Sequence, residues 1–168
     1  MSADPEPRVS LPRAMAEAIV RHAREARPDE SCGLVVGSAL AGDGGVALRY
    51  VRCRNAATSR SRYVVHRDDL LAVLAELDRS GEELWGVVHS HVRSAAIPSS
   101  TDVGEAAWPS AVYLLVSLAG DGDAAVPASA LPDVRAWRIA GGVARELVLD
   151  IHGDLGDGVR DDVREGAR

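Results

Sequence analysis

The sequence predicts a single α/β domain in which a mixed central β-sheet is flanked by helices. The 168 residues suffice to bury one full core, and 46% of them are hydrophobic. Segments with a helical apolar stripe are interspersed with short β-prone runs, and no internal repeat interrupts that order. We place the domain at residues 9–151, between a flexible N-terminus (1–8) and a charged, disordered tail (152–168) that lacks periodicity.

The first half of the chain is expected to hold a helix followed by three strands. Ser10 as N-cap and Pro12 in the first turn are typical of a helix start, and Pro28 ends this helix. A glycine-rich turn at 41–45 joins the first two strands. The three β-prone runs are residues 33–37, 46–52 and 63–65.

The second half begins with a helix that starts at Asp68 or Asp69 and runs through Asp78, with Gly81 just past its end. A β-prone run at 84–88 then leads directly into His89. The Ser and Thr residues at 99–101 are a strong N-cap signal for a short helix. The remaining predicted elements are a buried strand and a hairpin across two glycines, at residues 112–117, 134–139 and 143–150.

Composition narrows the function classes. The net charge of −6 argues against a nucleic-acid partner, for which a basic patch is expected. No apolar run is long enough to cross a bilayer, and the acidic N-terminus has no signal-peptide core, so we expect a cytoplasmic protein. Cys32 and Cys53 are too few for a disulfide framework. Cys32 is expected to be a buried strand residue; the alternative is a place near the functional site.

The segment most informative about function has the pattern H-x-H, seven residues, S-x-x-D. On a strand, residues i and i+2 point to the same face, so His89 and His91 should converge on one spot. The seven-residue spacer can fold the following helix start back over the strand end, which brings Asp102 to the histidines and Ser99 beside it. Three protein ligands leave a fourth position for water, as a catalytic zinc site requires.

This pattern resembles that of the JAMM metalloproteases, the zinc-dependent members of the MPN-domain family. The resemblance implies a single MPN domain with cytidine-deaminase-like layering, and one zinc ion held by His89, His91 and Asp102. It implies that Glu30 is the general base on the zinc-bound water and then the acid to the leaving amine. It also implies that Ser99 donates a hydrogen bond to the tetrahedral intermediate. One departure is Val92, where many members carry proline.

An H-x-H pair alone is usually accidental. The alternative interpretation of the full pattern is an MPN-like scaffold with an inactive site. Loss of any of the five functional residues would favour that interpretation, and the sequence retains all five.

Within the family, the compact chain resembles the bacterial CysO-cysteine peptidase branch. The matching stretches include the residues around Glu30 and around Ile97-Pro98-Ser99. The resemblance implies hydrolysis of the bond between the C-terminal Gly-Gly of a ubiquitin-like sulfur-carrier protein and an attached cysteine. The alternatives are an isopeptidase or trimming peptidase for another ubiquitin-like modifier, and a non-catalytic binding module. Arg93 could hold a substrate carboxylate or be an exposed loop charge. The resemblance also leaves a homodimer open, because MPN domains often pair.

Overall fold

The computed structural model describes residues 7–122 and 130–153, which form one seven-stranded sheet in the order β1-β7-β6-β5-β4-β2-β3. β1 pairs with β7, and β4 with β5, in parallel; the other neighbours are antiparallel, which confirms the predicted mixed sheet. The strands are β1 (Arg8–Pro12), β2 (Cys32–Gly37), β3 (Ala47–Cys53), β4 (Glu83–His91), β5 (Val112–Ser117), β6 (Asp133–Ala140) and β7 (Val143–His152).

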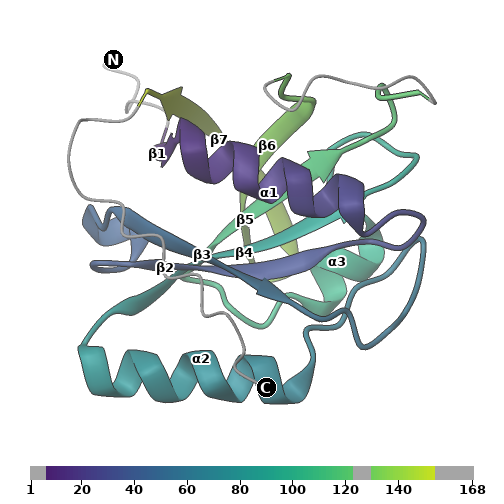
Figure 1. Ribbon diagram of the computed structural model, residues 1–168. Helices are drawn as coiled ribbons and strands as arrows, with labels where there is room; N and C mark the ends of the chain where they lie inside the picture. The colour runs from purple at the N-terminus through teal and green to yellow at the C-terminus, as the bar shows by residue number, and fades with distance from the viewer. Residues whose placement is uncertain (1–6, 123–129, 154–168) are drawn as a thin grey trace.

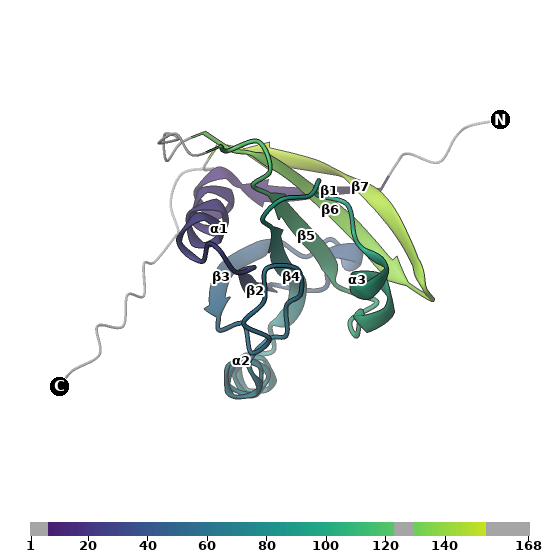
Figure 2. The same ribbon diagram turned by 90° about the vertical axis from the view of Figure 1, so that its right-hand side faces the viewer.

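Helices cover both faces of the sheet (Figures 1 and 2). The helical elements are α1 (Arg13–Glu25), η1 (Ala41–Asp43), α2 (Arg67–Ser80) and α3 (Ser100–Glu105). One hydrophobic cluster joins α1 to the sheet, and a second cluster on the other face joins α2 and α3 to it. In β4, Val88 belongs to the first cluster and Val87 to the second. His89 and His91 follow Val87 at steps of two, so they lie on the face that carries α3.

The predicted helix start at Ser10 is wrong. Residues Arg8–Pro12 form the edge strand β1, which pairs with the end of β7, and α1 begins only at Arg13. Val9 and Leu11 are buried and Ser10 is exposed, which is the alternation of a strand. Pro12 is the N-cap residue of α1 and makes no side-chain hydrogen bond to the helix. Its ring fixes φ, here −59°, at a value that suits the passage from the strand into the helix.

The predicted strand at 63–65 is also wrong. Only an isolated bridge between Asn55 and Val65 occurs there, and the rest of the segment is loop. The Asn55 side chain accepts the Val64 amide hydrogen bond, so this backbone group pairs with a side chain and not with a neighbouring strand. The predicted hairpin is confirmed: Ala140 pairs with Val143, and Gly141 and Gly142 both adopt positive φ, as a tight hairpin turn requires.

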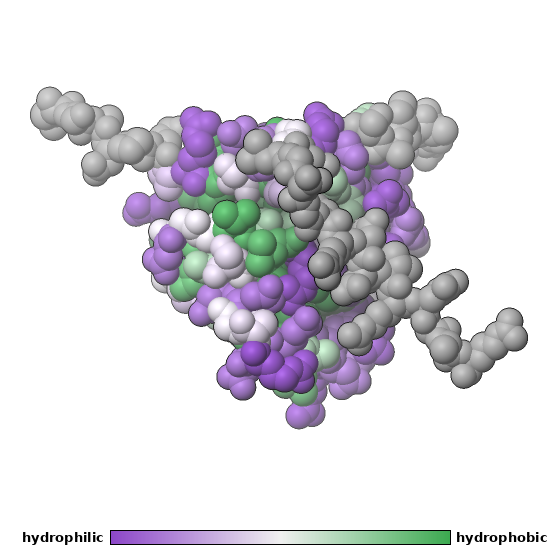
Figure 3. Space-filling model, turned by 60° about the vertical axis from the view of Figure 1, so that its left-hand side comes forward, coloured by the Kyte–Doolittle hydropathy of each residue, from purple (hydrophilic) through white to green (hydrophobic). Residues whose placement is uncertain are grey.

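The expected domain boundaries stay a prediction. β1 begins at Arg8 and β7 ends at His152. The predicted flexible N-terminus and disordered tail fall mostly on residues 1–6 and 154–168, outside the described residues. On the face drawn in Figure 3, hydrophilic residues surround a small hydrophobic patch. None of the helices in the described ranges is long and apolar enough to cross a membrane.

Candidate metal centre

The two histidines of the H-x-H pattern end the interior strand β4. His89 is fully buried and His91 is 6% exposed, and their Nε2 atoms lie 3.2 Å apart. β4 pairs with β2 as far as His89 and with β5 through His91, so neighbouring strands fix the backbone that carries both rings. The expectation that the two rings converge is therefore confirmed.

Asp102 reaches the histidines because it belongs to the first turn of α3. Ser99 is the N-cap of this helix: its Oγ accepts from the Asp102 amide at 3.2 Å, and the Ser99 amide donates to Asp102 Oδ2 at 2.6 Å. This reciprocal pair is a capping box, which fixes the helix start. The carboxylate then faces both rings, with Oδ1 3.3 Å from His89 Nε2 and Oδ2 3.3 Å from His91 Nε2.

The spacing of these atoms fits a tetrahedral zinc ion. His89, His91 and Asp102 each offer one ligand atom, and these atoms lie within 4.8 Å of one another. Two ligands about 2.1 Å from a tetrahedral zinc are separated by about 3.4 Å, close to the contacts found here. Nδ1 of His91 lies 2.8 Å from the Ala95 carbonyl oxygen and can donate to it, which leaves Nε2 free to bind a metal.

The Asp102 carboxyl is held in its charged form. Burial alone would raise the pKa of Asp102, but hydrogen bonds from His89, His91 and Ser99 outweigh burial and hold this pKa well below its ordinary value. The Ser99 hydroxyl takes part through a 2.7 Å hydrogen bond to Oδ2. Two imidazoles and an ionised carboxylate form a donor set of the kind that catalytic zinc sites use.

Glu30 lies two residues before the start of β2 and close enough to His91 and Asp102 to feel the charge of both. Cys32 of β2 pairs with His89, and Ser31 and Ser90 continue the pairing through the bond from the Ser90 amide to the Ser31 carbonyl at 3.1 Å. Glu30 is 5% exposed. Burial raises its pKa to about 7; the charge of His91 opposes this shift and that of Asp102 adds to it. A carboxyl group with such a pKa can exchange protons near neutral pH.

Asn55 is a positioning residue that the sequence analysis missed. Its Nδ2 donates to the carbonyl oxygens of Glu30 at 3.0 Å and Arg62 at 3.1 Å. Its Oδ1 accepts from the amides of Ala57 at 2.9 Å and Val64 at 3.0 Å. One side chain thus ties the loop after β3 to the backbone of Glu30. The local bond from the Ala57 amide, two residues on, gives no sign of the contact with Glu30, which lies 25 residues away in the chain.

Replacing Asn55 by alanine is expected to lower the free energy of unfolding by about 2 kcal/mol, because four hydrogen bonds are lost and their backbone partners are left unpaired. Urea unfolding followed by circular dichroism measures this. Asn55→Asp keeps the acceptor for Ala57 and Val64 but turns a carboxylate oxygen toward the carbonyl oxygens of Glu30 and Arg62, so it should be at least as unstable as Asn55→Ala. An alanine variant as stable as wild type would contradict this role.

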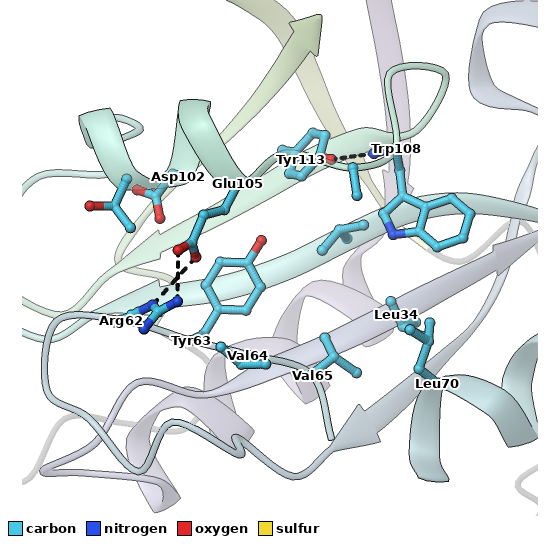
Figure 4. Close-up of a pocket in the computed structure, with 13 residues that line it drawn as sticks. Leu34, Arg62, Tyr63, Val64, Val65, Leu70, Asp102, Glu105, Trp108 and Tyr113 are labelled. Carbon is cyan, nitrogen blue, oxygen red and sulfur yellow. Dashed lines mark hydrogen bonds and ion pairs between the residues drawn. The ribbon is translucent and has the colours of Figure 1, made fainter. Parts of the chain in front are cut away.

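A cavity of about 210 Å³ adjoins Asp102 (Figure 4). Arg62 and Glu105 form an ion pair at 2.7 Å on its rim, and Tyr63 lies next to Arg62 along the wall. Its other apolar lining includes Leu34, Val65, Leu70, Trp108 and Tyr113. Arg93 is exposed in the loop after His91 and does not line this cavity.

The cysteines are free and buried. The Cys32 backbone pairs with His89, but its Sγ lies toward the carbonyl oxygens of Cys53 and Arg54, at 3.8 and 3.5 Å. Burial raises the pKa of the Cys32 thiol to about 12, so it stays protonated at neutral pH and is a poor metal ligand. Cys32 is therefore a buried strand residue, as the sequence favoured.

The arrangement of an H-x-H strand, a capped helix that carries a third candidate ligand, and an upstream buried glutamate is typical of the JAMM class of MPN domains. The family model described as prokaryotic homologs of the JAB domain matches residues 12–140, and the chain belongs to this family.

Named relatives and solved structures agree with this family. The chain is 32% identical to a desampylase of Haloferax volcanii over 114 residues, which cover 66% of this chain and 81% of the relative. It is 36% identical to the CysO-cysteine peptidase of Mycobacterium tuberculosis over 105 residues, 61% of this chain and 68% of the relative. These similarities place the chain among the JAMM hydrolases.

Two solution structures resemble this fold. A protein from Desulfitobacterium hafniense has a TM-score of 0.70 at 27% identity, covering 87% of this chain and 94% of that one. A protein from Salinibacter ruber has a TM-score of 0.59 at 26% identity, covering 86% and 91%.

Proposed function

We propose that this protein is a zinc-dependent peptidase of the cytoplasm that acts on a ubiquitin-like sulfur carrier. It hydrolyses the amide bond between the carrier's C-terminal glycine and an attached cysteine, and so releases cysteine. The observation that carries the proposal is the convergence of His89, His91 and Asp102 on one point, with Glu30 and Ser99 beside it. The similarity to a CysO-cysteine peptidase supports the choice of substrate.

His89, His91 and Asp102 hold the zinc ion in this proposal. Zinc, when bound, supplies a Lewis acid that polarises a carbonyl and lowers the pKa of water from about 16 to about 7. Asp102 contributes a full negative charge, because its pKa lies well below its ordinary value and a bound cation favours the carboxylate further. The two imidazoles are neutral ligands, so the centre keeps a net positive charge that attracts the carbonyl oxygen of the substrate.

Glu30 moves the proton. Its carboxylate takes a proton from the attacking water and returns it to the departing nitrogen of cysteine, which must leave as an amine. Its buried position and raised pKa suit both halves of this transfer. Ser99 is exposed and donates to Asp102 in this structure; with substrate bound, we assign its hydroxyl to the substrate's carbonyl oxygen. Arg93, which is exposed in the loop after β4, binds the carboxylate of the leaving cysteine.

A lysine isopeptide of a ubiquitin-like modifier is the second candidate substrate, and the similarity to a desampylase favours it. Both substrates present the same scissile carbonyl and differ only in the leaving amine. The cysteine adduct is a single residue with a free carboxylate, whereas the isopeptide continues into a second protein.

The two substrates can be compared directly by intact-mass spectrometry with zinc-loaded protein. One carrier ends in Gly-Gly-Cys, and the other is joined through Gly-Gly to a lysine side chain. We expect the first to lose one cysteine and the second to stay intact. Cleavage of the isopeptide alone would move the function to the second candidate. Tight carrier binding without cleavage of either, and without zinc, would indicate a binding module.

A further inference from the structure

The two histidines of the metal centre are held in different ways. Nδ1 of His91 is anchored on the Ala95 carbonyl oxygen at 2.8 Å. Nδ1 of His89 is buried and has no hydrogen-bond partner among the described residues. A metal-binding histidine usually donates a hydrogen bond from its second ring nitrogen to an acceptor, which fixes the rotation of the ring. Without that bond, the χ2 torsion of an imidazole has a broad range, so His89 needs another constraint.

Tyr63 provides that constraint. Its ring lies against His89 with the two centroids 4.2 Å apart and the planes inclined by 19°, which is a stacked contact. A stacked ring restricts rotation of its neighbour, because turning the imidazole out of this plane produces a clash or loses the contact. The electron-rich face of a phenol ring also suits an imidazole that becomes electron-poor when it binds a cation.

The loop that carries Tyr63 is itself fixed on both sides of this residue. Arg62 pairs with Glu105 of α3 at 2.7 Å, and its carbonyl oxygen accepts from Asn55 at 3.1 Å. The amide of Val64 donates to Asn55 at 3.0 Å. Tyr63 is therefore held in place by its neighbours in the chain, and it can hold His89 in turn.

We propose that Tyr63 is a positioning residue for the metal centre: its ring replaces the missing hydrogen bond at Nδ1 and sets the orientation of His89. The proposal rests on the metal site of the proposed function and is independent of the substrate. It also makes the loop 54–66 part of the site, since the same loop carries Asn55, which holds the backbone of Glu30.

Zinc affinity measured without substrate tests this proposal. The apoprotein is titrated with zinc against a chromophoric chelator, for wild type, Tyr63→Leu and Tyr63→Phe. Tyr63→Leu removes the aromatic face and should weaken zinc binding by about tenfold, the loss typical of residues that orient a ligand. Tyr63→Phe keeps the face and should bind zinc like wild type. A folded Tyr63→Leu with unchanged affinity would overturn the proposal, as would an equal loss in Tyr63→Phe.

Trp108→Leu is the matched control, because it removes an aromatic ring from the same cavity without touching His89. Its zinc affinity should stay at the wild-type value. A loss equal to that of Tyr63→Leu would point to general loosening of the cavity and contradict a specific stack.

Nuclear magnetic resonance of the unmodified, zinc-loaded protein gives a reading that does not depend on any variant folding. The ring current of Tyr63 should move the carbon-bound ring protons of His89 upfield of those of His91. Equal positions for the two histidines would contradict the stack. Because none of these measurements uses a substrate, a failed peptidase assay and a failed stacking proposal remain distinguishable.

Discussion

Replacing Glu30 by glutamine is expected to lower kcat by about a thousandfold, while the protein still binds one zinc ion. Glutamine has nearly the same shape but cannot accept a proton, and a general base contributes roughly 10²- to 10⁴-fold to such reactions. The backbone bonds that hold this position, from Asn55 and to Ser59, do not involve the side chain and should persist. Steady-state kinetics on the carrier adduct and zinc analysis of the same sample measure both effects.

Asp29→Asn is the matched control for this replacement. It makes the same change of charge one residue away, and Asp29 is not part of the cluster around His89, His91 and Asp102. Its kcat should stay near the wild-type value. A Glu30→Gln variant that keeps wild-type turnover would exclude Glu30 as the base, and an equal loss in both variants would point to a general electrostatic effect.

The pH profile gives the same assignment a second reading. The base must be a carboxylate, so activity should rise with pH through the pKa of Glu30. Burial raises this pKa from 4.5 to about 7. The positive charge of a neighbouring zinc ion favours the carboxylate and pulls the pKa back down. We therefore expect the acid limb of kcat/KM to fall between these two values. The limb should vanish from the residual activity of Glu30→Gln; a limb that remained there would belong to another group.

Replacing His91 by alanine is expected to abolish both zinc binding at stoichiometric concentration and hydrolysis. Two ligands hold a zinc ion much more weakly than three. The zinc affinity should therefore fall by more than the roughly 100-fold that is lost when a residue hydrogen-bonded to a ligand is changed. The same change also frees the loop after β4, because His91 no longer donates to Ala95. Zinc titration against a chelator measures the first effect and the carrier assay measures the second.

His22→Ala is the control for a histidine replacement. His22 lies on α1, and its Nδ1 is 2.8 Å from the Tyr50 hydroxyl, on the face of the sheet opposite α3. Burial lowers its pKa to about 4, so it is neutral at pH 7 and contributes no charge to the metal centre. This variant can lose stability but should keep zinc. If His91→Ala retained wild-type zinc affinity, the ligand assignment would be wrong.

The parts of the site that the sequence predicted are those with local signals. The alternation of a strand places His89 and His91 on one face, and the Ser99 cap places Asp102 in the first turn of α3. Both patterns depend on residues that are neighbours in the chain. No local pattern marks Glu30, and the sequence analysis placed it in the candidate site only through the family resemblance.

The parts that the sequence analysis missed depend on contacts between distant segments. The Ser-x-Pro pattern at residues 10–12 has the local form of a helix start, but pairing with β7 makes it a strand. Residues 63–65 are also β-prone, but they form a loop because the Asn55 side chain bonds the Arg62 carbonyl oxygen and the Val64 amide. The stack of Tyr63 on His89 joins two segments that no periodicity relates.

Hydrolysis of the carrier adduct in ¹⁸O-labelled water tests the central claim most directly. The carrier ending in Gly-Gly-Cys is incubated with zinc-loaded protein, and the shortened carrier is weighed by intact-mass spectrometry. If Glu30 directs water onto the glycine carbonyl, the product should carry one ¹⁸O atom in its new carboxylate, and Glu30→Gln should yield almost no product. A shortened carrier without the label, or an adduct that stays intact beside zinc-loaded wild type, would contradict the account.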